Sequence, residues 1–303
     1  MIEKFNFYDV YGYFLPGLVF LAVLWLPFGI VQKTWPGGEW GSAIALLALA
    51  YLVGHFLQTI ATNALPSRLA DGQRYPSDAA LDPAFKETKA KLPDQMRIKI
   101  EAIVREEFGL ELRVDEVGNE KIDKVRNNAF SLARSVLSRE KGVSYAEQFQ
   151  GMYALTRGLV VALGFGFAYI LGWSASSFIE TACSIRAIYF GIIGAMILVV
   201  IVSSIVALRR HLKETKRIAL EKAAWILMHF PLLGAGYLAG QSYVIETGAT
   251  TCRRGAMFGV IALGMLLSSL RFYSAYKFFA SHFAVTVWRD FLAFNALRQG
   301  KVQ

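Results

Sequence analysis

Long apolar runs separated by polar, charged blocks dominate the pattern along the chain. A helix needs roughly 20 apolar residues to cross a bilayer. Six runs approach that length, at residues 13–31, 42–60, 152–173, 187–208, 223–240 and 255–270. The fifth and sixth runs are short, so an arrangement with four crossings and a membrane-embedded hairpin fits the same pattern. We therefore expect an all-α fold, a polytopic membrane helix bundle.

The stretch between the second and third runs has a different character. It is rich in charges of both signs, and its apolar residues recur with helical spacing over 96–104 and 122–136. These features predict a helical insertion outside the membrane. The expected domains are a transmembrane hairpin (1–65), a cytoplasmic helical insertion (66–150), further transmembrane helices (151–270) and a cytoplasmic C-terminal helix (271–303).

The C-terminal helix is expected to be amphipathic and aromatic. A helix of this kind packs on the bundle or lies along the membrane surface, and we expect one of these two positions. The residues that share its apolar face are Phe272, Tyr276, Phe279, Phe283, Val287 and Phe294.

Composition and charge agree with a membrane protein. Only 18% of the 303 residues are charged, 55% are hydrophobic and the mean hydropathy is +0.40. A soluble domain carries about a quarter charged residues, so an ordinary soluble enzyme is disfavoured. Lys and Arg concentrate in the N-terminus, the insertion, residues 209–222 and the tail. The positive-inside rule then predicts a multi-pass membrane protein with both termini and the insertion in the cytoplasm.

The second predicted helix carries a polar face formed by Tyr51, Gly54, His55 and Gln58. Polar side chains inside a membrane helix are costly unless they face protein or water. They therefore line a pore or sense protons, or they form interhelical hydrogen bonds with Gly54 allowing close approach; the second interpretation is favoured. Arg157, one turn into the third helix, either reaches the headgroups, which is favoured, or lines an aqueous vestibule.

Two basic clusters are candidates for an anionic ligand. On the cytoplasmic side they could bind polyphosphate or nucleic acid. For residues 209–217 attraction to anionic lipid explains the charges at least as well, and for residues 121–141 a solvent-exposed helix face is the default interpretation. The residues are Lys121, Lys124, Arg126, Arg134, Arg139, Lys141, Arg209 and Arg210.

The two cysteines, Cys183 and Cys252, both fall in loops predicted to lie outside the cytoplasm. In an oxidising compartment they can form one disulfide, and the alternative is two unpaired thiols. The sequence contains no recognisable catalytic motif and no metal-ligand spacing. We therefore expect no enzyme activity, no cofactor and no metal.

Two segments, FYDVYGYFLPGLVFL (7–21) and YLVGHFLQTIATN (51–63), resemble small bacterial membrane effectors of anti-phage defence. Within that group, the layout is most similar to the channel subunits of Hailong systems. The resemblance implies a homo-oligomeric channel, such as a tetramer, whose opening damages the host membrane. It also implies a nucleotide or DNA-oligomer ligand that is made by a nucleotidyltransferase encoded nearby and holds the channel closed.

These sequence features leave three functions open. A ligand-gated channel effector leads, and a non-conducting membrane anchor or scaffold that recruits a soluble partner is the alternative. A small transporter is disfavoured, because it would be expected to carry charges deep within the membrane.

Overall fold

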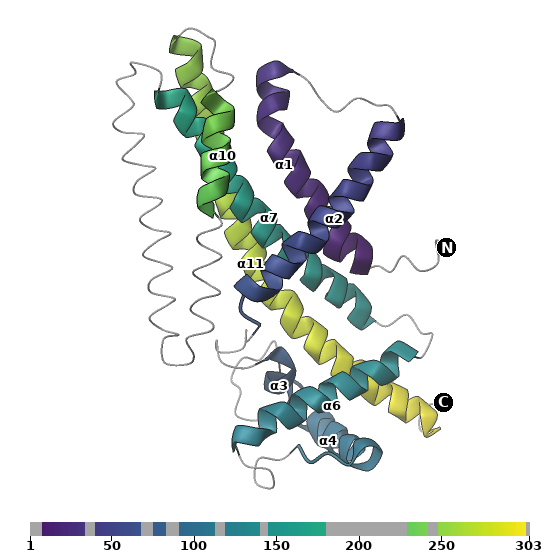
Figure 1. Cartoon of the computed structure of the whole chain (residues 1–303). Helices are drawn as coiled ribbons and strands as arrows, with labels where there is room; N and C mark the ends of the chain where they lie inside the picture. The colour runs from purple at the N-terminus through teal and green to yellow at the C-terminus, as the bar shows by residue number, and fades with distance from the viewer. Residues whose placement is uncertain are drawn as a thin grey trace. The chain divides into compact units, whose positions relative to one another are not determined.

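The computed structural model describes residues 8–33, 40–67, 75–82, 91–112, 119–139, 145–179, 229–241 and 248–300 (Figure 1). Every regular element in these ranges is a helix, which confirms the all-α prediction for the described part. The elements are η2, a π-helix (Asp9–Phe14), α1 (Leu15–Gln32), α2 (Trp40–Ala64), α3 (Pro76–Leu81), α4 (Asp94–Phe108), α6 (Asn119–Arg139), α7 (Tyr145–Ile179), α10 (His229–Gln241) and α11 (Gly248–Arg298).

Four helical segments of the described chain are long and apolar enough to cross a membrane, which is compatible with a membrane protein. They match the first, second, third and sixth predicted runs and are longer than each of them. The fourth run, 187–208, lies outside the described residues. Of the fifth run only residues 229–240 are described, within the 13-residue helix α10. The candidate spans are Asp9–Gln32, Ala43–Ala64, Tyr145–Ser177 and Arg253–Arg298.

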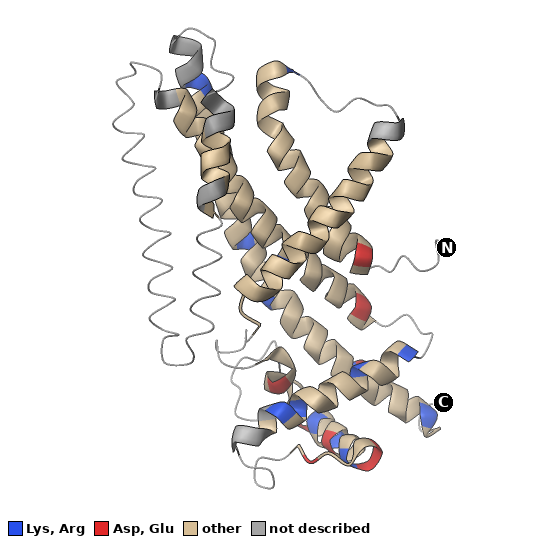
Figure 2. Ribbon diagram, in the orientation of Figure 1, with Lys and Arg blue, Asp and Glu red and all other residues tan. Residues whose placement is uncertain are grey.

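The chain divides into two compact units. The charged unit consists of Met1–Gly12, Pro66–Thr156 and Ser274–Gln303, and the apolar unit of Tyr13–Leu65 and Arg157–Tyr273. Figure 2 shows that the coloured charges gather on α3, α4, α6 and the C-terminal part of α11. The predicted insertion and the predicted tail therefore belong to one unit, and helices α7 and α11 each contribute to both units.

The core of the charged unit is closed by the C-terminal half of α11. Trp288 is completely buried, its Nε1 donates to the carbonyl of Ser77 at 3.3 Å, and its ring lies 5.6 Å from that of Phe130. Tyr276, on the predicted apolar face of the tail, packs on α7, one of the predicted bundle helices. The region around Trp288 differs from the prediction that the tail packs on the bundle or on the membrane surface. The apolar faces of α4 and α6 provide its packing partner instead. The core residues include Ile100, Val104, Ala129, Ala133, Val285, Trp288 and Phe291.

Three chain segments meet at Tyr276, also in the charged unit. The Tyr276 hydroxyl donates to the carbonyl of Pro66, just after α2, at 3.0 Å. It lies 3.4 Å from the hydroxyl of Tyr153 on α7, and the two rings stack with centroids 5.0 Å apart. Since only 1% of Tyr276 is exposed, these bonds are shielded from water. Within the charged unit, Tyr276 therefore joins α11 to α7 and to the segment that begins at Pro66.

Helix α7 is the central element of the apolar unit. In the most apolar stretch of α7, 89% of the residues are buried, against 22–28% in the corresponding stretches of the other three candidate spans. Buried serines fasten it to α11: Ser174 Oγ donates to the carbonyl of Gly255 at 2.7 Å, and Ser269 Oγ donates to that of Val160 at 2.9 Å. The exposed apolar surface of the other spans is the surface that lipid would cover.

We predict that Trp288→Ala lowers the free energy of unfolding of the charged unit by about 3–5 kcal/mol, because it leaves a large cavity in the core. Denaturant titration of the full chain in detergent, followed by proteolysis of α4 and α6, measures the change. Leu297→Ala is the matched control on the same helix, since Leu297 is 61% exposed. Equal effects of the two substitutions would contradict the described core.

Candidate functional site

The polar face of α2 meets the start of the first candidate span. The His55 ring stacks on the Tyr13 ring, with centroids 3.7 Å apart and planes 15° apart. Tyr51 meets the same imidazole edge-on, at 4.6 Å and 81°. His55 is therefore held between two tyrosines by ring contacts.

Two glycines allow α1 and α2 to cross at very short range (Figure 1). A Cβ atom on Gly54 would collide with the carbonyl oxygen of Tyr13, and one on Gly17 would collide with that of Ala50. Close approach of this kind is how small residues pack membrane helices without a hydrophobic driving force. A second glycine crossing joins α7 and α10, where Gly172 and Gly236 each face backbone of the other helix.

A polar bridge links α2 to α7. Arg157 Nε donates to Gln58 Oε1 at 2.9 Å, and Gln58 is only 3% exposed. Gly158, the next residue on α7, makes room for the Gln58 amide and the Pro16 ring. The sequence favours a position of the Arg157 side chain at the lipid headgroups and does not predict its hydrogen bond to Gln58. One feature of the sequence could have predicted this bond: a buried amide and a guanidinium in neighbouring spans each require a polar partner.

The four residues of the predicted polar face, together with Arg157 on α7, thus take part in contacts between helices of the apolar unit. Tyr51, His55 and Gln58 hold their neighbours by side-chain contacts, and Gly54 does so by its lack of a side chain. This arrangement favours the packing interpretation over the pore-lining one for the described residues.

The predicted basic cluster on α6 is divided by the fold. Lys124, Arg134 and Arg139 are exposed, whereas Arg126 is only 4% exposed. Arg126 is therefore not available as a surface ligand-binding residue, and that assignment is corrected. The physical reason is helical spacing, since position 126 shares the buried stripe of Ile122, Ala129 and Ala133.

The described residues around α6 also bury charge of the opposite sign. Helix α3 packs on α6 and contains Asp78, which has no exposed surface, followed by the nearly buried Asp82. Buried charges require paired or hydrogen-bonded surroundings, so Arg126 serves the interior of the unit. The Lys121 side chain, Lys141, Arg209 and Arg210 lie outside the described residues.

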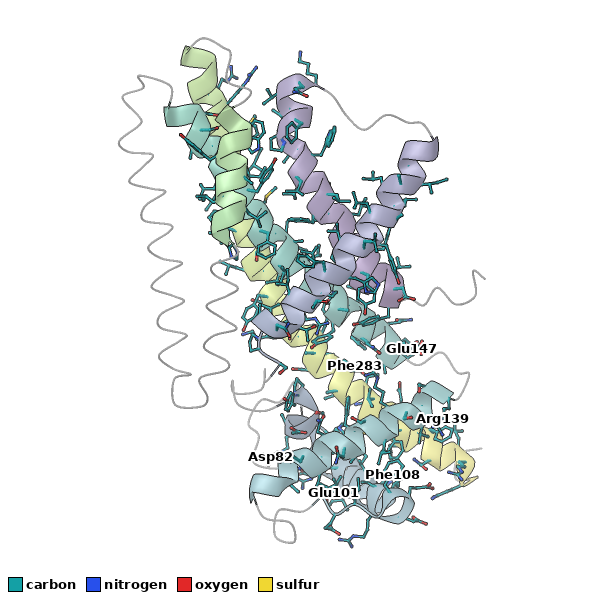
Figure 3. All side chains as sticks on the ribbon, in the orientation of Figure 1. Asp82, Glu101, Phe108, Arg139, Glu147 and Phe283 are labelled. Carbon is teal, nitrogen blue, oxygen red and sulfur yellow. The ribbon has the colours of Figure 1, made fainter. Side chains whose placement is uncertain are left out.

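A cavity of about 420 Å³ opens in the charged unit. Its walls carry two carboxylates, Asp9 and Glu147, and one guanidinium, Arg134, which lies 5.6 Å from the centre of the Phe283 ring. Glu147 and Phe283 are labelled in Figure 3. The sequence does not predict this site, because its acidic residues are far apart in the chain and neither belongs to a catalytic or ligand-binding motif.

Comparisons of the sequence and the structure with protein-family models, curated proteins and solved structures found no match. In the described part of the chain, no three His, Cys, Asp or Glu side chains cluster as metal ligands would. Nothing in the described residues tests the predicted disulfide, since Cys183 and the side chain of Cys252 lie outside them. The backbone of Cys252 lies in the second turn of α11 rather than in a loop.

We predict that Gly54→Ala destabilises the apolar unit by about 1–3 kcal/mol or more, because the new methyl group must force α1 and α2 apart. Gly264→Ala is the matched control: Gly264 is also within a candidate span, and nothing lies within 4 Å of its Cβ position. Thermal unfolding in detergent measures both variants. Equal stability of the two would contradict the tight crossing.

Proposed function

We propose that this protein is a homo-oligomeric membrane channel whose opening is controlled through its charged unit. The observation that carries the proposal is that α7 and α11 each contribute residues to both units. A rearrangement in the core around Trp288 must therefore be accommodated by helices that also pack the apolar unit. The hydrogen bonds of Tyr276 to Pro66 and with Tyr153 add the end of α2 to the same connection.

The proposed setting is the inner membrane of a bacterium, with the charged unit and both termini in the cytoplasm. The distribution of Lys and Arg supports this orientation through the positive-inside rule. The resemblance of residues 7–21 and 51–63 to effectors of anti-phage defence supports a role in which channel opening harms the infected cell. No catalytic step is part of this proposal.

The proposed ligand is anionic, a nucleotide or a short DNA oligomer made by a nucleotidyltransferase encoded nearby. Lys124 and Arg139 are the exposed α6 cations best suited to bind it, because Arg134 shares its cavity with two carboxylates. A ligand shifts a closed–open equilibrium only if it binds one state better than the other. Basic residues from neighbouring copies, brought together in one state, would supply that difference.

Purified protein in planar bilayers tests the proposal. We predict a conductance that short oligonucleotides reduce, and that Lys124→Glu with Arg139→Glu makes insensitive to them. Two phosphate contacts imply about tenfold weaker binding when salt rises from ~0.05 to ~0.2 M. The matched control is Lys99→Glu, a charge reversal at an exposed position of α4, which should keep the response.

The outcomes separate the alternatives. Absence of conductance under all conditions would contradict the channel and favour the non-conducting anchor or scaffold. A conductance that responds to neither oligonucleotide nor the α6 substitutions would support the channel and exclude the anionic ligand.

A further inference from the structure

The cavity in the charged unit combines three kinds of lining. Asp9 and Glu147 provide negative charge, and Arg134 provides one positive charge beside them. Leu137, Phe283 and Val287 add an apolar wall. Its volume, about 420 Å³, lies within the range of ordinary small-molecule sites. A ligand that complements these walls carries a cation and an anion close together, joined to an apolar part.

The position of the two acids in the chain indicates the depth of the cavity in a membrane. Asp9 is the first residue of the first candidate span, and Glu147 lies in the first turn of the third. Carboxylates are too costly to place in hydrocarbon, so the ends of these spans belong at the level of the lipid headgroups. The lining residues are therefore where a headgroup would be found.

We propose that this cavity binds a zwitterionic group that carries a primary ammonium and a phosphate, either as a phosphatidylethanolamine headgroup or as the free phosphoethanolamine. The ammonium would donate hydrogen bonds to the carboxylates of Asp9 and Glu147, and the phosphate would accept from the guanidinium of Arg134. The apolar wall would face the glycerol end of a lipid. This site is separate from the proposed channel ligand and does not depend on gating.

The other ligand classes fit less well. Two carboxylates on the walls repel a polyanion such as an oligonucleotide. A quaternary choline group matches the charge but has no N–H to donate. A structural metal ion would require more ligands, and the described residues contain no such cluster.

The experiment measures which lipid the full chain retains. Protein in detergent is mixed with equal amounts of phosphatidylethanolamine, phosphatidylcholine and phosphatidylglycerol of identical acyl chains, and bound lipid is counted by native mass spectrometry. We expect about tenfold more phosphatidylethanolamine than either of the others, the difference that charge-assisted hydrogen bonds supply. Free phosphoethanolamine at millimolar concentration is then added as a competitor. Displacement identifies the soluble group as a sufficient ligand, whereas retention identifies the lipid as the source, and both results support the headgroup chemistry.

Substitutions assign the preference to the cavity. Glu147→Gln, at an exposed side chain, should reduce the preference for phosphatidylethanolamine over phosphatidylglycerol several-fold, and Asp9→Asn in addition should abolish it. Arg134→Gln should weaken retention of phosphatidylethanolamine. The matched controls are Glu106→Gln and Arg289→Gln, exposed residues of the same unit that do not line the cavity. Equal retention of the three lipids by the unaltered protein, or a preference that Glu147→Gln leaves unchanged, would overturn the proposal.

Discussion

The charged unit depends on the burial of one face of α11. Helices α4 and α6 are amphipathic, and their apolar faces need a third surface to exclude water. That surface comes from Val285, Trp288 and Phe291, near the end of the chain. The helix that contains the fourth candidate membrane span therefore also completes the core of the charged unit. Helices α7 and α11 therefore each belong to both units.

The apolar unit is held together by different forces. Between helices surrounded by lipid, apolar side chains gain little by meeting one another, so close backbone contact and buried hydrogen bonds carry the specificity. Gly54 and Gly172 provide the close contact, and Ser174 and Ser269 provide bonds from side chain to backbone. The bridge from Arg157 to Gln58 belongs to the same class. The charged unit differs in containing a cavity whose walls carry charges of both signs, from Asp9, Glu147 and Arg134.

The sequence predicted the helices well and their partners poorly. The apolar runs over 13–31, 42–60 and 152–173 are helical throughout, because length and hydropathy are local properties. Helical spacing also identified the buried stripes of α4 and α6. It does not identify what covers them, so the sequence places the aromatic tail on the bundle or the membrane surface and does not predict that Trp288 packs on α4 and α6. The sequence also wrongly places Arg126 among the surface ligand-binding residues. Its charge predicts exposure, whereas its position on the helix predicts the burial that the structure shows. The cavity forms because the fold brings Asp9, Arg134 and Glu147 to line one space, and no local sequence pattern predicts this.

Hydrogen exchange of the unaltered full chain in lipid nanodiscs tests most directly whether the end of α11 belongs to the charged unit. Amides in one cooperative core open together and show the same free energy and the same denaturant dependence. We predict that the amides of residues 280–296 have the same opening free energy and the same denaturant dependence as those of α4 and α6. The amides of residues 255–270 of the same helix should differ from them in both quantities. Exchange of residues 280–296 that is independent of α4 and α6, and that follows residues 255–270 instead, would contradict this prediction.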